Sequence, residues 1–224
     1  VSGACGSVTN SGRLTVNQAV GASALADVVK CAGDTVIFST AATGTGPYSY
    51  AWLKNGNVLG AQIGSSLTLN NVSAADAGIY SVVVSGACGS VTNSASLTVN
   101  QNLAVVSAPV SVTNCPGTSA SFNVSATGTG LSYQWYKGTA ALTGETGSSL
   151  VLGSVSALDA GTYSVMVSGT CGSPVSQSAT LTVNENVVVS TAPASLTNCP
   201  GTSASFSVSA TGTGLSYQWY KGTT

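Results

Sequence analysis

Short segments in which apolar and polar residues alternate recur along the whole chain, separated by turns rich in glycine, serine, threonine and asparagine. In residues 119–126, for example, Ala120, Phe122 and Val124 fall on one face and polar residues on the other. A period of two is typical of a β-strand with one buried face. Residues 101–184 are thus predicted to form strands at 105–113, 119–126, 131–136, 149–152, 163–168 and 176–183. Pro109 is expected at an edge position of the first strand, where no ladder hydrogen bond is lost. The predicted fold class is all-β.

The alternating pattern itself recurs about every 83 residues, a period that belongs to a repeated unit rather than to a single strand. Residues 113–122 are identical to 197–206, and residues 124–139 are identical to 208–223. One set of tryptophans and two sets of cysteines keep the same period: Trp52, Trp135 and Trp219; Cys31, Cys115 and Cys199; Cys5, Cys88 and Cys171. Identity over such lengths indicates duplication of a whole domain, rather than a small solenoid unit.

This period divides the chain into four pieces. Residues 19–100 and 101–184 are predicted to be two complete domains, joined end to end by very short linkers. Residues 1–18 repeat the last strands of a domain, and residues 185–224 repeat the first strands of another. Half a β-sandwich leaves its inner face in water, so flanking sequence or a neighbouring copy is expected to complete both end pieces. Short linkers favour a directed, semi-rigid array.

The motif Asp-x-Gly-x-Tyr identifies the type of sandwich. It stands at residues 76–80 and again at 159–163, and in both copies a segment alternating serine and valine or methionine follows. The motif resembles the corner that opens strand F of an immunoglobulin-like, I-set-like domain, in which the tyrosine bonds back to upstream backbone. The resemblance assigns this corner to Asp76 with Tyr80 and to Asp159 with Tyr163. It places Trp52, Trp135 and Trp219 in the core, on strand C.

Composition narrows the classes of function. The 224 residues include only five basic and six acidic side chains, no histidine, and a formal net charge of −1. Such a chain lacks the basic footprint of a nucleic-acid-binding protein. None of its apolar runs reaches the roughly 20 residues of a membrane span. Because solubility rests on uncharged polar residues, we expect an extracellular or cell-surface location.

Few residues of this chain are suited to catalysis or to metal binding. Without histidine there is no Ser-His-Asp triad and no base to activate a cysteine, and the acids show no repeated pairing of the glycosidase kind. No repeated calcium cage can be built, because only Asp76 and Asp159 recur between repeats. The prediction is therefore no enzyme and no cofactor. Outward-facing Tyr136 and Leu53 are candidates for contact with surface glycans.

The cysteines do not occupy the positions that the resemblance implies for the disulfide between strands B and F. Three lie before strand B (Cys31, Cys115 and Cys199), and three lie in the turn between strands F and G (Cys5, Cys88 and Cys171). In this sandwich the two turns lie at opposite poles. A strand of roughly eight to ten residues separates them by about 25–35 Å, because each residue adds about 3.3 Å. A disulfide needs Cα atoms within about 7 Å. We therefore expect disulfides and an oxidising compartment, but no bond inside one domain.

Two pairings remain open, within the chain or between laterally packed chains. The preferred one is an inter-domain disulfide, which pairs Cys31 with Cys171. Cys115 and Cys199 would then pair with cysteines of later repeats or of a neighbouring copy. Cys5 and Cys88 would pair with cysteines of earlier repeats or of a neighbouring copy.

The sequences NCPGTSASF, QWYKG, DAGTYSV and SGACGS resemble tandem immunoglobulin-like modules of large bacterial surface and secreted adhesin-type proteins, particularly those of Bacteroidetes. The resemblance implies a structural repeat segment of an extracellular fibre or adhesin stalk, whose partners are neighbouring repeats or copies. The alternative is a spacer or carbohydrate-binding accessory module of a secreted glycan-active enzyme. A third possibility is self-assembly into a filament of many chains.

Overall fold

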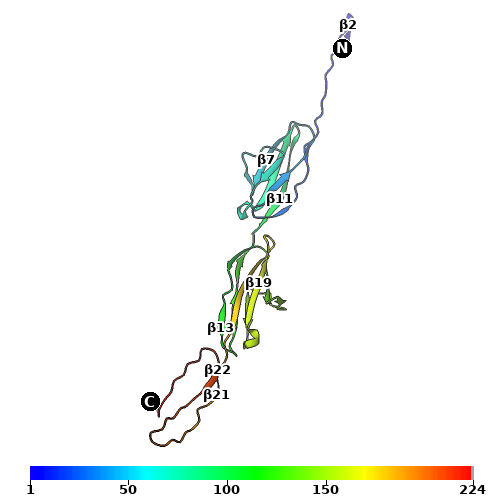
Figure 1. The fold of residues 1–224 in the computed structure, drawn as a ribbon. Coiled ribbons are helices and arrows are strands. Elements are labelled where there is room, and N and C mark those ends of the chain that lie inside the picture. The colour runs from blue at the N-terminus through cyan, green and yellow to red at the C-terminus, as the bar shows by residue number, and fades with distance from the viewer. Residues whose placement is uncertain (223–224) are drawn as a thin grey trace. The chain divides into compact units, whose positions relative to one another are not determined.

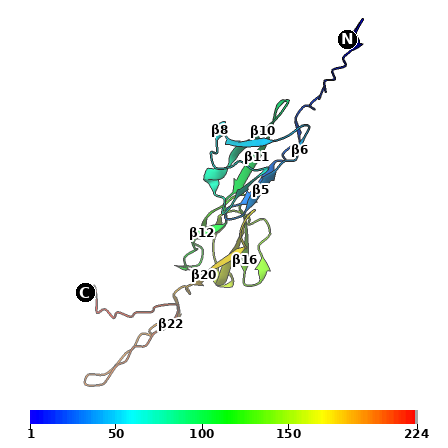
Figure 2. The ribbon, with the colours of Figure 1, turned by 90° about the horizontal axis from the view of Figure 1, so that it is seen from above.

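The structure is a computed structural model that describes residues 1–222; Thr223 and Thr224, which end the predicted fourth piece, lie outside the described residues. The chain folds into immunoglobulin-like β-sandwiches in tandem, as predicted, with 45% of residues in strands and 3% in helical turns. It divides into two compact units, Val1–Gln101 and Asn102–Thr224. Each unit contains one complete sandwich (Figures 1 and 2).

In the first unit a five-stranded sheet packs against a smaller layer. The large sheet has the order β4 (Val28–Cys31), β11 (Gly89–Asn100), β10 (Gly78–Gly86), β7 (Ser49–Lys54) and β8 (Asn57–Val58). The opposite layer pairs β5 (Val36–Ser39) with β9 (Ser66–Leu69), and β3 (Gly21–Ala22) with β6 (Ala42–Thr43). A single 3₁₀ turn, η1 (Ala74–Asp76), leads into β10.

The second unit repeats this topology. Its large sheet has the order β13 (Val112–Asn114), β20 (Val175–Val183), β19 (Gly161–Ser168), β16 (Ser132–Lys137) and β17 (Ala140–Ala141). Opposite it, β14 (Ala120–Asn123) pairs with β18 (Ser149–Leu152), and β12 (Ala104–Ser107) pairs with β15 (Ser125–Thr127). The turn η2 (Ala157–Asp159) precedes β19.

In both units the first long segment of the domain changes sheets midway. The predicted strand at 105–113 is two strands, because β12 pairs antiparallel with β15 whereas β13 pairs parallel with β20. Pro109 lies between them and is buried; its missing N–H interrupts the ladder there. Likewise, the predicted strand at 119–126 is split at Val124, because β14 and β15 have different partners.

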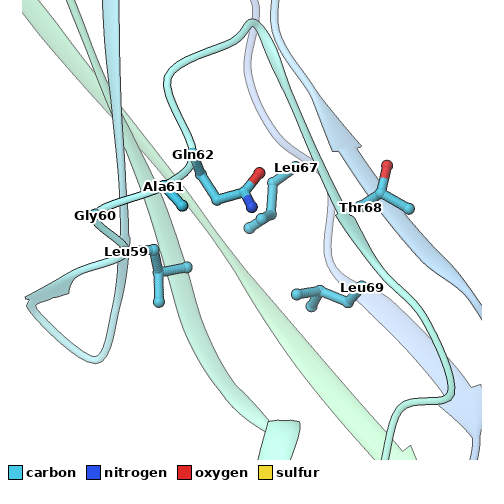
Figure 3. Close-up of a pocket in the computed structure, with 7 residues that line it drawn as sticks. All are labelled: Leu59, Gly60, Ala61, Gln62, Leu67, Thr68 and Leu69. Atoms are coloured by element: carbon cyan, nitrogen blue, oxygen red, sulfur yellow. The ribbon is translucent and has the colours of Figure 1, made fainter.

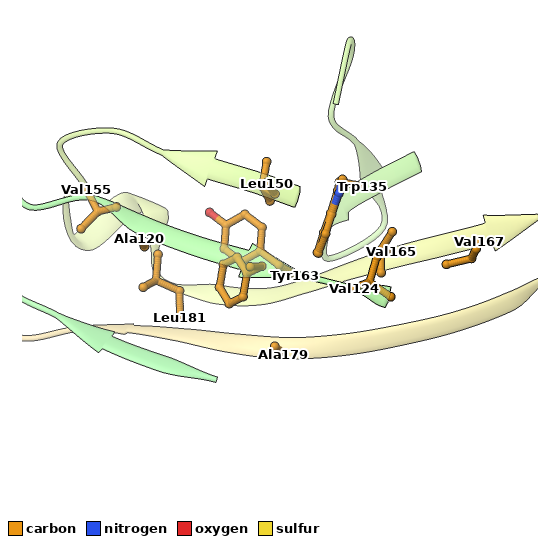
Figure 4. Close-up of a cluster of buried hydrophobic side chains, with 11 residues drawn as sticks. Ala120, Val124, Trp135, Leu150, Val155, Tyr163, Val165, Val167, Ala179 and Leu181 are labelled. Carbon is orange, nitrogen blue, oxygen red and sulfur yellow. The ribbon is translucent and has the colours of Figure 1, made fainter. Parts of the chain in front are cut away.

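The core of each sandwich consists of the inward-facing residues of both sheets. Trp52 and Trp135 have no exposed surface, and each donates its indole N–H to a backbone oxygen 2.9 Å away. Figure 4 shows how Trp135, Tyr163 and Val165 point into the layer between the sheets of the second unit. Phe122 stacks on the ring of Tyr163, with 5.2 Å between the ring centroids. The aromatic side chains thus fill the centre of the sandwich with their polar atoms hydrogen-bonded.

Each of the two end pieces forms one short antiparallel pair of strands. Residues 1–18 contribute β1 (Ser2–Gly3) and β2 (Gly6–Ser7), and residues 185–222 contribute β21 (Val188–Thr191) and β22 (Ser209–Thr211). Trp219 is 52% exposed and Phe206 is 55% exposed. Trp219 was predicted to be a core residue, but it lies in no core here. In the second unit β18 and β19 cover Trp135, whereas no described residue from 212 to 222 belongs to a strand that could cover Trp219.

Candidate linkage sites at the poles of each domain

Hydrogen bonds fix the corner before strand F, which is β10 in the first domain and β19 in the second. The hydroxyl group of Tyr80 donates a 2.8 Å hydrogen bond to the carbonyl oxygen of Asp76, and Tyr163 does the same to Asp159. The carboxylate of Asp159 accepts 2.8 Å bonds from the backbone N–H and the hydroxyl group of Ser156. The corner therefore uses both the main chain and the side chain of its aspartate, and fixes the start of strand F.

These contacts shift two kinds of pKa. The hydrogen bonds from Ser156 lower the pKa of the Asp159 carboxyl group, and those from Ser73 lower that of Asp76 in the same way. Burial, followed by the nearby aspartate charge, raises the pKa of the Tyr80 and Tyr163 hydroxyl groups. The folded state thus favours a charged aspartate beside a neutral tyrosine.

At the N-terminal pole of the first domain lie the segment that enters the domain and the turn between β10 and β11. Cys88 is in this turn, which begins after Gly86 and ends at Gly89. The carbonyl oxygen of Cys88 accepts a 3.4 Å hydrogen bond from the N–H of Val20. The incoming chain and the turn cysteine therefore lie side by side.

Cys31 lies at the C-terminal pole of the same domain. It is the last residue of β4, and its Cα partner in the parallel pairing with β11 is Asn100, where β11 ends. Ala32 donates a 2.9 Å hydrogen bond to the carbonyl oxygen of Asn100. The carboxylate of Asp34 accepts a 3.1 Å bond from the N–H of Cys31 and closes the turn before β5. The cysteine thus lies level with the point where the chain leaves the domain.

The second domain has the same arrangement. Leu103, on the incoming segment, donates a 2.9 Å hydrogen bond to the carbonyl oxygen of Cys171 in the turn between β19 and β20. At the other pole Asn184 donates a 2.9 Å bond to the carbonyl oxygen of Asn114, the residue before Cys115.

The two cysteines of one domain cannot meet. Cys31 and Cys88 lie at opposite ends of β11, whose 12 residues span about 36 Å at roughly 3.3 Å per residue. The nine residues of β20 separate Cys115 from Cys171 by about 26 Å or more. Both spans are several times the roughly 7 Å that a disulfide allows between Cα atoms.

Exposure distinguishes the cysteines. Cys5, Cys88, Cys115 and Cys199 are exposed free thiols; Cys31 and Cys171 are not among them. Cys171 is 2% exposed and Cys31 is half-buried, although their counterparts in the other repeat, Cys88 and Cys115, are exposed.

Two further surfaces carry side chains that could contact a ligand. Leu53 on β7 and Tyr136 on β16, the candidates for glycan contact, are half-buried on the outer face of strand C. Their cross-strand partners are Ser81 on β10 and Ser164 on β19. A hollow of about 310 Å³ beside β9, which the sequence did not indicate, is lined chiefly by Leu59, Leu67 and Leu69 (Figure 3). The residues named on these two surfaces are all uncharged.

Within residues 1–222, no group of three or more cysteine, aspartate or glutamate side chains lies close enough to hold a metal ion. None of the helical segments in the same residues is long and apolar enough to cross a membrane.

Comparison with known proteins identifies the domain type. Residues 22–99 match the immunoglobulin I-set domain. An I-band fragment of titin is similar over 80% of this chain and 70% of its own length, with a TM-score of 0.64 and 21% identity. Immunoglobulin domains 1–5 of Sidekick-1 match over 88% of this chain and 46% of their own length, with a TM-score of 0.64 and 20% identity. The first two domains of DIP-gamma match over 74% of this chain and 97% of their own length, with a TM-score of 0.58 and 16% identity. Identities this low establish the fold alone.

Proposed function

We propose that this chain is a structural repeat segment of an extracellular fibre or adhesin stalk of a bacterial surface protein, in which disulfides join successive domains. The observation that carries the proposal is the placement of one cysteine at each pole of each complete domain. A cysteine pair too far apart to bond within a domain is suitably placed to bond across junctions. The domain boundaries proposed for this array are 1–18, 19–100, 101–184 and 185–224.

In this arrangement the cysteine before strand B of one domain bonds the F–G cysteine of the next domain, so Cys31 pairs with Cys171. The low exposure of these two side chains, relative to Cys88 and Cys115, supports this pairing. Cys115 then pairs with the F–G cysteine of a following domain. Cys88 pairs with a cysteine of the preceding one.

Formation of each bond removes two protons and two electrons from two thiols. An external disulfide accepts them by thiol–disulfide exchange, and is itself reduced to two thiols. Such bonds persist in an oxidising compartment, which agrees with a cell-surface location. We call an inter-domain disulfide of this kind a staple. A staple at each junction fixes the orientation of neighbouring domains, and needs no repeated calcium site between them. The selected property is then the length and stiffness of the array.

Peptide mapping by mass spectrometry tests the proposal. The full chain is oxidised with a glutathione disulfide couple, alkylated, and digested without reduction. The expected product is a linked peptide containing Cys31 and Cys171, and the variant Cys31→Ser should release Cys171 as an alkylated thiol. A linked peptide containing Cys31 and Cys88 would contradict the pole geometry and favour independent domains, as in a spacer. Six alkylated thiols would contradict the extracellular location.

A further inference from the structure

Each domain has two segments that run from pole to pole, and we call these the spanning segments. In the first domain they are residues 20–31 and 88–100. At the N-terminal pole they begin together, because Val20 donates a hydrogen bond to Cys88. At the C-terminal pole they end together, because Cys31 and Asn100 are Cα partners in the parallel pairing of β4 with β11.

The second domain has spanning segments at residues 103–115 and 171–184. Leu103 bonds Cys171 at one pole, and β13 lies parallel to β20 up to the partners Asn114 and Val183 at the other. In both domains, therefore, each spanning segment has a cysteine at one end and an inter-domain linker at the other.

From this placement we infer that the disulfide-linked array cannot lengthen by unfolding under tension. The inference rests on the proposed pairing of Cys31 with Cys171. With a staple at every junction, tension enters a domain through the linker and through the F–G cysteine. It leaves through the cysteine before strand B and through the next linker. The whole load therefore passes along the two spanning segments.

The spanning segments have almost no length to release. The first domain is about 36 Å from pole to pole, and the roughly 11 peptide units from Val20 to Cys31 extend at most to about 40 Å. Residues 32–87, which hold β5, β7, β9 and β10, lie in a covalent loop that carries no load. Loss of the noncovalent structure of this loop therefore adds only a few ångströms to the array.

Reduction changes this property. Without the staple, tension passes through every residue of a domain. The roughly 80 peptide units from Val20 to Asn100 then extend to about 280 Å, so each domain that unfolds lengthens the array by about 240 Å. The cysteines thus make the extensibility of the array depend on redox state. The oxidised array resists lengthening under tension, and the reduced array lengthens as its domains unfold.

Pulling single molecules of the full chain by its two ends tests the inference. One staple between Cys31 and Cys171 removes about 140 residues from the load path, at about 3.5 Å of stretched length per residue. We therefore expect oxidised molecules to reach a fully stretched length about 490 Å shorter than that of reduced molecules. Neither complete domain should then give a step above about 20 Å. Reduced molecules, and the double variant Cys31→Ser with Cys171→Ser, should show two steps of about 240 Å, one from each complete domain.

The matched control is Cys115→Ser, which removes a cysteine outside the proposed pair and should leave the oxidised trace unchanged. Peptide mapping of the same preparation separates the two hypotheses. If Cys31 and Cys171 are linked but each domain still releases more than about 50 Å, well beyond the slack of the spanning segments, the bond joins two chains; the inference then fails, although the pairing of these cysteines stands. If a peptide joins Cys31 to Cys88 and the stretched length falls by about 200 Å, the length of the chain between those residues, both fail.

Discussion

Substitution of Tyr163 by phenylalanine removes one hydrogen bond from the corner before strand F and leaves the packing intact. Phenylalanine retains the ring that stacks on Phe122 and that lies 5.7 Å from the Lys137 ammonium group. It loses the 2.8 Å bond from the hydroxyl group to the carbonyl oxygen of Asp159. A hydrogen bond contributes about 0.5–1.5 kcal/mol net, and a buried partner left unsatisfied costs about 1–3 kcal/mol.

Because Asp159 is only half-buried, water can solvate part of the carbonyl group that loses its donor. We therefore expect Tyr163→Phe to lower the free energy of unfolding of the second domain by about 1–2 kcal/mol. For a domain of about 80 residues, this corresponds to a fall in Tm of about 5–15 °C. Tyr80→Phe should have an equal effect on the first domain, because its bond to Asp76 has the same length.

Urea denaturation followed by hydrogen exchange and mass spectrometry measures each domain separately, because peptides from β10 and β19 report on different sandwiches. The matched control is Tyr136→Phe: within residues 1–222, the hydroxyl group of Tyr136 makes no hydrogen bond. This control should change stability by less than about 0.5 kcal/mol. If Tyr163→Phe and Tyr136→Phe differ by less than that amount, the corner bond does not stabilise the domain, and the reasoning is wrong.

Three other predictions concern burial, backbone and charge. Trp135→Phe should destabilise the second domain by about 1–3 kcal/mol because it leaves a cavity and a carbonyl group without its donor, whereas Trp219→Phe should change stability by less than about 0.5 kcal/mol; urea denaturation measures both. Gly161→Ala should cost about 1–3 kcal/mol because φ is +139° there. Gly153→Ala, with open space around its Cβ position, should have little effect when both variants are compared by urea denaturation. The pKa of the Asp159 carboxyl group is lowered below the unfolded value of 3.8, so its stabilisation is present above about pH 4 and is lost as the pH falls through the lower, folded-state pKa. Stability measured from pH 5 to pH 2 should therefore decline less steeply in Asp159→Asn than in the unchanged chain, and parallel curves would contradict this account.

The alternating pattern was sufficient to predict which face of each strand is buried, because one face of every sheet packs on the core. Ala120, Phe122 and Val124 were assigned to the interior and are at most 5% exposed. The strand at 149–152 was predicted with the bounds that the structure has. The ends of the strands were less predictable. The alternation of apolar and polar residues continues through Pro109 and Val124, although the strand that pairs with the chain changes at both residues. Alternation alone therefore did not mark these strand ends.

Contacts between segments distant in sequence were also hard to predict. The Asn55 side chain accepts a 2.9 Å hydrogen bond from the N–H of Ile79, and no periodicity in the sequence marks this contact. The serine that binds the corner aspartate could have been found, because Ser73 and Ser156 both stand three residues before Asp76 and Asp159. A serine with an acidic residue three positions later is the spacing of a capping box.

The strand that contains the core tryptophan shows why sequence identity does not determine local structure. Residues 124–139 and 208–223 are identical, and both copies bring a phenylalanine beside the tryptophan: the ring centroids of Phe122 and Trp135 are 6.3 Å apart, and those of Phe206 and Trp219 are 6.5 Å apart. Residues 132–137 of the first copy form β16, which pairs with β19 and buries Trp135 completely. The corresponding residues 216–221 of the second copy form no strand, and Trp219 is half exposed. Because the local sequence is the same, pairing with strand F (β19) must determine whether strand C (β16) forms. The tendency of these residues to form a strand therefore depends on the strand beside them. The corner that positions strand F, at Asp159 and Tyr163, thereby also determines the burial of a tryptophan more than twenty residues before it.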